Sequence, residues 1–299
     1  MSIISRTACP ICQNKSFEPY RTCTDHTVSQ EKFTIVRCSE CGFRFTQNVP
    51  DEASIGRYYE SEDYISHSNA QKGAVNSMYQ LARRYMMGKK RKFVQELSGK
   101  TSGRLLDYGC GTGEFAAHMQ NSGWSVLGME PSTDARRFAV ENNKIEALTP
   151  DELFTRTLEP FDVLTLWHVL EHVHRLHETL ARLKELMAPK GVMIVAVPNA
   201  DAREELTYKE FWAAWDVPRH LYHFDASAMK QLTEQHGLKI MSTRPMPLDA
   251  FYVAMLSERY KYGAVDWPRA ANEGRKTWAA ARKDYHQASS LLYVLREAR

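Results

Sequence analysis

The sequence predicts an α/β fold, a mostly parallel β-sheet with helices on both faces, preceded by a small β module. Two observations support this prediction. From residue 103 onward, apolar runs of strand length alternate with amphipathic helical stretches, which is the order of a parallel sheet with crossover helices. Before residue 50, strand-like sequence lies between two C-x-x-C pairs. The 299 residues, 43% of them hydrophobic, are enough for one large domain with such an appendage.

Composition and charge argue against several classes of partner. The 39 basic and 36 acidic residues give a formal charge of +3 and form no long block of one sign, so nothing in the sequence demands nucleic acid or an anionic membrane. The first residues lack the apolar run of a signal peptide, and no apolar stretch approaches the roughly 20 residues of a membrane helix. We expect a cytoplasmic protein with a small-molecule partner, and the oligomeric state stays open.

Residues 1–48 are predicted to form a zinc-binding β module, a zinc ribbon. Cys9 and Cys12 in "CPIC" precede Cys38 and Cys41 in "CSECG". Four thiolates with this spacing form a closed tetrahedral zinc site, which contributes folding energy to a module too small for a core of its own. A redox role is the weaker alternative, because no thioredoxin-like βαβ unit surrounds the pairs.

Residues 49–102 are predicted to form a helical cap and a linker. The helical pattern runs through "SMYQLARRYMMGKKRKFVQEL" and ends at "SGKTSG". The basic run "RRYMMGKKRK" is expected to be the solvated face of a helix that packs on the sheet, although it keeps an RNA-binding alternative open. Residues 1–60 contain seven basic and seven acidic residues, so the β module is a poor phosphate binder.

The alternation that predicts the sheet fills residues 103–299. "RLLDY", "WSVLGME" and "FDVLTLW" are strands followed by the helices "GEFAAHMQNSG", "STDARRFAVENN" and "HRLHETLARLKELMA", and "GVMIVAVP" is the next strand. A last helix, "DASAMKQLTEQHG", leads to the strand "LKIMSTRP". A polar stretch over about residues 262–288 then precedes "SSLLYVLREA".

A glycine-rich turn follows the first strand of the sheet. "LLDYGCGTGEF" places Asp107 at the strand end and Gly109, Gly111 and Gly113 before a helix. Glycines let backbone amides approach a ligand at a helix N-terminus, which favours negative charge. The spacing differs from the G-x-G-x-x-G of dinucleotide folds. Glu130 ends the next strand, where its carboxylate can accept hydrogen bonds from both hydroxyls of a ribose. The two motifs together therefore predict a nucleoside site.

Four motifs in order, "LLDYGCGTGEF", "LGMEPS", "FDVLTLWHVLEHV" and "GVMIVAVPN", resemble those of class I S-adenosylmethionine-dependent methyltransferases over about residues 103–244. The resemblance implies a Rossmann-like seven-stranded sheet and S-adenosylmethionine as the cofactor. It implies that Asp107 and the glycine turn hold the amino acid part, that Glu130 holds the ribose, and that residues 151–153 flank the adenine. An exposed helix cap is an equally good interpretation of Asp151. The cofactor-binding residues are then Asp107, Gly109, Gly111, Gly113, Glu130, Pro131, Asp151, Trp167 and His168.

His168, Glu171 and His172 have the spacing H-x-x-E-H, which some zinc peptidases place on one helix. Here "FDVLTLW" is predicted to be a strand, so His168 lies at its carboxyl end, where open α/β sheets bind ligands. In the ubiquinone-type O-methyltransferases that this segment resembles, the position of His168 is usually acidic, and some relatives bind a divalent cation there. We rank cofactor or substrate contact first for His168, a structural role second and metal ligation third. We expect no second metal, and expect Glu171 and His172 to cap and anchor the following helix.

The segment "FWAAWDVPRHLYHFD" gathers aromatic and polar side chains, which an organic substrate pocket needs. In the family that the sequence resembles, this segment and the one before the first strand, here "YYESEDYISHS", cover the acceptor. Histidine suits removal of a proton near neutral pH. His220 is the first choice for the base, and His168 and His223 are alternates. For each of them, a packing role is an equally good interpretation.

The zinc ribbon before such a domain resembles the arrangement in sugar C-methyltransferases, and certain ribosomal RNA methyltransferases also have an N-terminal zinc site. The sequence therefore predicts a methyltransferase that acts on the oxygen or carbon of a small molecule, with S-adenosylmethionine and a structural zinc. The alternatives are an RNA methyltransferase and a cofactor-binding module without catalysis whose ribbon docks a protein. The acceptor and the methylated atom stay open.

Overall fold

A seven-stranded β-sheet forms the centre of the computed structural model, which describes residues 2–60, 74–246 and 248–298, without the side chains of residues 74–85. The strand order is β12-β13-β10-β9-β6-β7-β8. Strand β13 is antiparallel to both neighbours, and the other pairs are parallel, which confirms the predicted Rossmann-like sheet. The strands are β6 (Gly103–Tyr108), β7 (Trp124–Met129), β8 (Ala147–Leu148), β9 (Phe161–Trp167), β10 (Met187–Pro198), β12 (Leu238–Pro245) and β13 (Ser290–Glu297).

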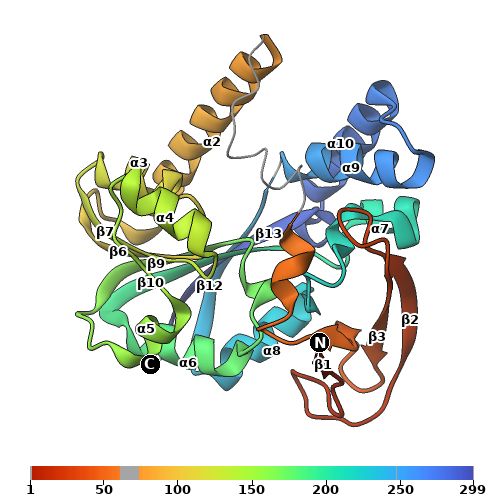
Figure 1. Ribbon diagram of the computed structural model, residues 1–299, viewed down its shortest axis with the longest axis horizontal. Helices are drawn as coiled ribbons and strands as arrows, with labels where there is room; N and C mark the ends of the chain where they lie inside the picture. The colour runs from red at the N-terminus through yellow and green to blue at the C-terminus, as the bar shows by residue number, and fades with distance from the viewer. Residues whose placement is uncertain (1, 61–73, 247, 299) are drawn as a thin grey trace.

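Helices cover both faces of this sheet, as predicted (Figure 1). Successive side chains of a strand point to opposite faces, so Leu105 of β6 is buried in one cluster with Phe115. Its neighbour Leu106 is buried in another cluster with Leu180. The helices are α2 (Ala74–Ser98), α3 (Glu114–Gln120), α4 (Thr133–Glu141), α5 (Pro150–Thr155), α6 (Leu176–Glu185), α7 (Arg203–Tyr208) and α8 (Ala226–Gln235).

The N-terminal strands form a separate antiparallel sheet, and we call residues 2–50 the ribbon. Its four strands have the order β11-β4-β3-β2, and a further pair joins β1 to β5. The edge strand β11 comes from the segment after β10, and pairs Tyr222 with Phe45 and His223 with Arg44. A distant part of the chain therefore completes the ribbon sheet. The strands are β1 (Ile3–Ile4), β2 (Phe17–Thr24), β3 (Lys32–Cys38), β4 (Arg44–Gln47), β5 (Val49–Pro50) and β11 (Tyr222–His223).

A helical hairpin follows β12. It consists of α9 (Asp249–Tyr262) and α10 (Trp267–Ala281), and α10 lies within the polar stretch of about residues 262–288, for which the sequence predicts no element. Asp266 caps α10 by accepting a hydrogen bond from the amide of Arg269. The buried face of α10 consists of small or polar residues, namely Ala270, Glu273, Gly274, Thr277 and Ala281. Helix α9, in contrast, buries Ala250 and Ala254 while Phe251 and Tyr252 are exposed. Its sequence therefore has no clear hydrophobic period from which a helix could be predicted.

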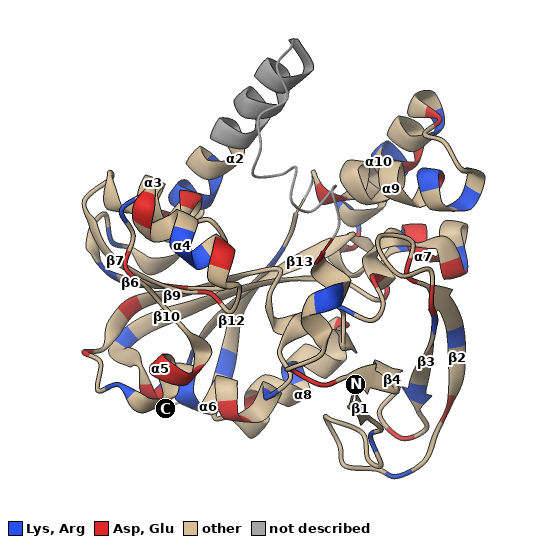
Figure 2. Ribbon diagram, in the orientation of Figure 1, with Lys and Arg blue, Asp and Glu red and all other residues tan. Residues whose placement is uncertain are grey.

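The region between the ribbon and the sheet contains a 3-10 helix, η1 (Ile55–Tyr59), and α2. Most of the predicted acceptor-covering segment "YYESEDYISHS" lies outside the described residues. The domain boundaries at residues 48 and 102 stay predictions. Basic and acidic side chains are interspersed over the elements (Figure 2). Among the described residues, no helix combines the length and apolar character required to cross a bilayer.

Candidate active site

The glycine turn lies at the carboxyl end of β6, next to the point where the strand order reverses. All three glycines have left-handed backbone angles, with φ of 77° at Gly109, 55° at Gly111 and 80° at Gly113. A Cβ atom on Gly109 would lie 2.5 Å from a methyl group of Val169, and one on Gly113 would lie 2.8 Å from Ala139. The turn therefore requires glycine for both its conformation and its close packing.

Glu130 connects the end of β7 to this turn. Its carboxylate accepts one hydrogen bond from the amide of Gly111 and one from the amide of Ser132, both at 2.9 Å. Burial raises the pKa of Glu130, and the two amides oppose that shift. The side chain is thus fixed at the edge of the crevice that open α/β sheets form outside their strand ends.

Asp107 and Lys90 bring opposite charges to the same edge. Asp107 is buried, and its carboxylate accepts a hydrogen bond of 2.7 Å from the hydroxyl of Thr165. Burial raises the pKa of Asp107 to about 6. The ammonium of Lys90 lies 4.6 Å from the ring centre of Trp167. Burial lowers the pKa of Lys90, and the charges of Asp107 and Asp249 oppose that shift only in part.

Lys90 corrects the expectation that the basic run is only a solvated face. On α2 it lies on the same side as Met87, Val94 and Leu97, which pack in the cluster against the sheet. These positions are three or four residues apart, so they share one face of the helix. That spacing is the signal by which Lys90 could have been found.

His168 is a cation held between two carboxylates. Its Nε2 lies 3.1 Å from Asp249 Oδ2, and its Nδ1 lies 3.7 Å from Glu171 Oε1. Burial acts to lower the pKa of His168, but the nearby carboxylates of Asp249 and Glu171 raise it to about 10. A histidine that is protonated at neutral pH is a poor general base. Asp249 begins α9, and no local motif of the sequence predicts that it reaches this site.

Glu171 and His172 belong to the 3-10 helix η2 (Leu170–His172), and their contacts differ from those expected. Helix α6 begins after Arg175, so these two residues do not cap it. The two carboxylate oxygens of Glu171 are buried and accept no hydrogen bond from any described residue. Nδ1 of His172 lies 3.0 Å from the hydroxyl of Tyr59 and 3.0 Å from the carbonyl of Arg219. Burial lowers the pKa of His172 to about 4.

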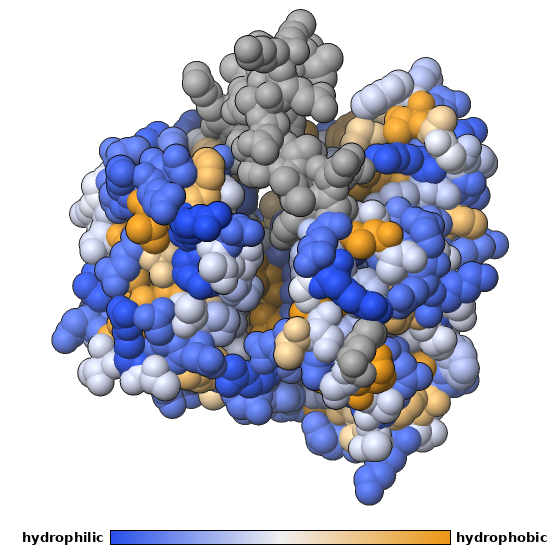
Figure 3. Space-filling model, viewed as in Figure 1, coloured by the Kyte–Doolittle hydropathy of each residue, from blue (hydrophilic) through white to orange (hydrophobic). Residues whose placement is uncertain are grey.

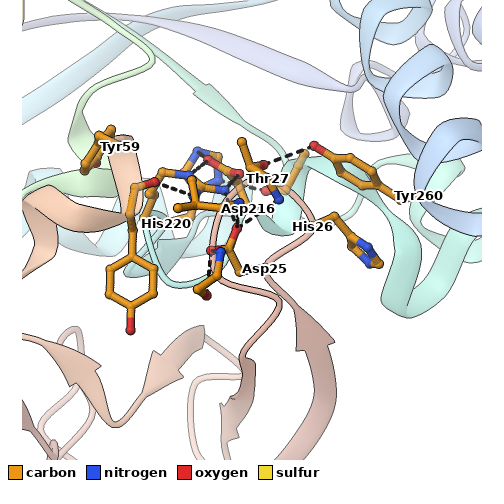
Figure 4. A network of polar contacts seen from close by, with 12 residues as sticks. Asp25, His26, Thr27, Tyr59, Asp216, His220 and Tyr260 are labelled. Carbon is orange, nitrogen blue, oxygen red and sulfur yellow. Dashed lines mark hydrogen bonds and ion pairs between the residues drawn. The ribbon is translucent and has the colours of Figure 1, made fainter. Parts of the chain in front are cut away.

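His220 lies against His172, with ring centres 4.6 Å apart. Figure 4 shows His220 and Asp216 in one network of polar contacts. Its Nδ1–H donates to the carbonyl of Ala214 at 2.8 Å, which leaves Nε2 to accept a proton. That Nε2 lies 3.8 Å from Asp216 Oδ2, so a carboxylate is available to a protonated ring. The Asp216 carboxylate also accepts from Arg219, whose guanidinium pairs with Asp25 of the ribbon.

The side chain of His223 contacts residues of the ribbon and of the Trp215 segment, which does not suit a general base. Its Nε2 lies 2.9 Å from the hydroxyl of Thr46, and its ring packs edge-on against Trp215. Trp212 and Trp215 are 2% and 1% exposed, and they pack with ribbon residues instead of lining an open pocket. Burial lowers the pKa of His223 well below its usual value.

Of the remaining predicted cofactor residues, Trp167 and Pro131 lie at strand ends, whereas Asp151 is exposed. Trp167 ends β9 beside Lys90, and Pro131 directly follows Glu130. The Asp151 side chain is 87% exposed and pairs with Arg175 at 3.1 Å. Asp107, the glycine turn, Glu130, Trp167 and His168 thus meet at the ends of three adjacent strands. The face of the molecule that Figure 3 shows has a central hollow with apolar residues at its bottom.

The four cysteines of the C-x-x-C pairs form one cluster. The sulfur of Cys9 lies 3.6 Å from that of Cys41, and the sulfur of Cys12 lies 3.5 Å from that of Cys38. A tetrahedral zinc ion with Zn–S bonds of about 2.3 Å needs sulfurs about 3.8 Å apart, so the thiols fit such an ion. Among the described residues, a further group with ligand atoms within 4.8 Å of one another consists of Glu171, His172 and His220.

A seven-stranded sheet with one antiparallel strand, a glycine turn after its first strand and a carboxylate after its second define the class I methyltransferase architecture. A family model described as a methyltransferase domain matches residues 81–243, more than half of the chain. The chain belongs to this family. The matched residues exclude the ribbon and the α9–α10 hairpin.

The chain is similar to curated ubiquinone biosynthesis O-methyltransferases. It is 29% identical over 168 residues to the one from Rhodopseudomonas palustris strain BisB5, covering 51% of this chain and 65% of that protein. It is 32% identical over 118 residues to the one from Caulobacter sp. strain K31, covering 36% and 47%. The chain therefore spans less than two thirds of the length of these relatives.

Among solved structures, magnesium protoporphyrin IX methyltransferase from Synechocystis PCC 6803 with bound SAH has a TM-score of 0.53 at 12% identity. The similarity covers 83% of this chain and 100% of that one. At this identity the comparison supports the fold alone.

Proposed function

We propose that the chain is an enzyme that transfers a methyl group from S-adenosylmethionine to an oxygen or carbon atom of a small-molecule acceptor. The observation that carries the proposal is the Glu130 carboxylate, held beside the glycine turn by the amides of Gly111 and Ser132. The similarity to ubiquinone biosynthesis O-methyltransferases is consistent with a small organic acceptor.

The cofactor would lie along the ends of β6, β7 and β9, and it supplies a methyl group on a sulfonium centre. Glu130 would accept hydrogen bonds from the ribose, and Asp107 and the glycine turn would hold the amino acid part. Pro131, Trp167 and His168 would line the same site, and Asp151 would contribute only at its exposed rim. Lys90 adds a cation beside Asp107, suited to a carboxylate of the ligand.

On the acceptor side, His220 remains our first choice for the base. Its Nδ1–H donates to the carbonyl of Ala214, which leaves the Nε2 lone pair for a proton, and Asp216 would stabilise the resulting charge. The protonated state of His168 disfavours it as base and suits it to orient Asp249 and Glu171. His223 bonds to Thr46 and faces the ribbon.

A structural zinc on Cys9, Cys12, Cys38 and Cys41 is part of the proposal. The described cysteines are all free thiols, which suits a reducing cytoplasmic location. The RNA alternative loses one support, because Lys90 of the basic run packs towards the sheet. Catalysis, rather than cofactor binding alone, is favoured by His220, whose Nε2 is left to accept a proton and lies 3.8 Å from Asp216 Oδ2.

Calorimetry with S-adenosylhomocysteine tests the proposal. Glu130→Ala should weaken binding roughly 30-fold, because a hydrogen bond to a charged group contributes about 2 kcal/mol. Glu141→Ala, at an exposed glutamate of α4, is the matched control and should bind like the parent. Unchanged affinity in Glu130→Ala would remove the ribose assignment, and a parent that does not bind would remove the proposed function.

A further inference from the structure

Thr46 of the ribbon makes hydrogen bonds to three residues of the segment that carries His220. Its amide donates to the carbonyl of Leu221 at 3.0 Å. Its hydroxyl donates to the carbonyl of His220 at 2.7 Å and lies 2.9 Å from Nε2 of His223. Because the hydroxyl has one proton, the His223 ring must donate in the second contact. Thr46 is fully buried, so water cannot replace these bonds.

The same segment is bonded to the candidate active site on its other side. The amide of Leu221 donates to the carbonyl of Glu171 at 2.8 Å. On the same side, Nδ1 of His172 lies 3.0 Å from the carbonyl of Arg219. The guanidinium of Arg219 instead pairs with Asp25 of the ribbon at 3.1 Å. The backbone of residues 219–221 therefore lies between the ribbon and η2, and contacts on both sides hold the backbone that carries the His220 ring.

The strand that contains Thr46 is continuous with the metal-binding turn. The amide of Cys38 donates to the carbonyl of Phe43 at 2.9 Å, and β4 begins at the next residue. The Phe43 ring packs against the rings of Tyr222 and Phe224. The fold of a small ribbon depends on its metal, so loss of the ion would remove the partner strand of β11.

Ion pairs with one buried partner, Arg44 in one and Glu205 in the other, also fix the ribbon to the rest of the chain. Arg44 donates to the carbonyl of Ala200 and pairs with Asp201, and Arg21 pairs with Glu205. Such contacts cost more to break than exposed ion pairs do. They do not suit a ribbon that acts as an independent docking module.

We propose that Thr46 is a positioning residue for His220, and that a folded, metal-loaded ribbon is therefore a condition for the acceptor side of the active site. The role of His220 rests on the proposed function. The coupling between ribbon and segment does not, and it can be measured without methyl transfer.

Thr46→Val tests the positioning role, because it keeps the shape of the side chain and removes both hydroxyl contacts. We expect parent-like zinc content and cofactor affinity, about tenfold faster amide exchange at Leu221, and shifted ring resonances of His220 in NMR spectra. Thr46→Ser should restore the parent behaviour. Thr34→Val, on β3 of the same sheet, is the matched control and should resemble the parent. Parent-like exchange and His220 resonances in Thr46→Val would overturn the proposal.

The double variant Cys38→Ser, Cys41→Ser tests the dependence on metal. Exchange in residues 219–224 should accelerate at least as much as in Thr46→Val, while residues 103–108 of β6 stay protected. Retained protection of residues 219–224, or equal loss in β6, would overturn the coupling. If the parent fails to bind S-adenosylhomocysteine while the exchange results hold, the proposed function fails and the coupling stands.

Discussion

His168 has a left-handed backbone angle, with φ of 57°, which is uncommon for a residue other than glycine. Its ring lies at the end of β9 between two carboxylates, those of Asp249 and Glu171. The sequence indicates the place of His168, because a strand and its last residue are local features. It does not indicate the charge of the ring, because Asp249 belongs to a hairpin far along the chain. The glycine turn and Glu130 could be predicted for the same local reason.

The ion pairs of His168 should make stability depend on pH. The pKa of His168 is raised from 6.5 to about 10, so the stabilisation is complete below about pH 6.5 and is lost as the pH rises towards 10. His168→Gln should therefore melt below the parent at pH 6.5, and the gap should narrow by pH 10. Melting curves over this range, with the exposed His286→Gln as control, measure the gap. A gap that stays constant with pH would contradict the assigned charge.

The α9–α10 hairpin is held by a close contact between helices. At Gly274 an added Cβ would lie 2.7 Å from the Phe251 ring and 2.9 Å from its Cα atom. Such proximity to backbone cannot be relieved by a side-chain rotation. The hairpin matters to the site because α9 supplies Asp249. The hairpin could not be predicted from the sequence, because α9 buries the small residues Ala250 and Ala254 and exposes Phe251 and Tyr252, which obscures its hydrophobic period.

Gly274→Ala should destabilise the protein by about 1–3 kcal/mol, because it overpacks this interface. Gly88→Ala is the matched control in a helix, since a Cβ there meets no described atom within 4 Å. That change should leave stability unaltered or raise it by up to about 1 kcal/mol. Chemical denaturation measures both. If Gly274→Ala is as stable as the parent, the helices can separate at little cost and the close contact is not what holds them.

For the whole molecule, the alternation of strands and helices was sufficient to predict the central sheet. The partnership between the ribbon and the rest of the chain could not be predicted. Strand β11 has only two residues, Tyr222 and His223, and its partner is β4 near the N-terminus. So short a strand has no periodicity of its own, and its pairing follows from tertiary packing.

We expect one zinc ion per chain, bound by the four clustered thiols. Elemental analysis should give a stoichiometry of one in the parent and near zero in the Cys38→Ser, Cys41→Ser variant. Cys23→Ser should keep its zinc, because Cys23 lies outside the cluster. A stoichiometry of two, with the second ion lost in His220→Ala or His172→Ala, would contradict the expectation of a single metal and assign a second site to Glu171, His172 and His220.

The pairing of β4 with β11, which lies far along the chain, also has a consequence during synthesis on the ribosome. Strand β4 is synthesised well before residues 222–223, and at about 5–20 residues per second the ribosome needs on the order of ten seconds or more to produce them. During that interval the nascent chain presents an unpaired strand edge, which favours pairing with other molecules. The strand is only four residues long and begins with Arg44, and both a short edge and a charged residue discourage such pairing.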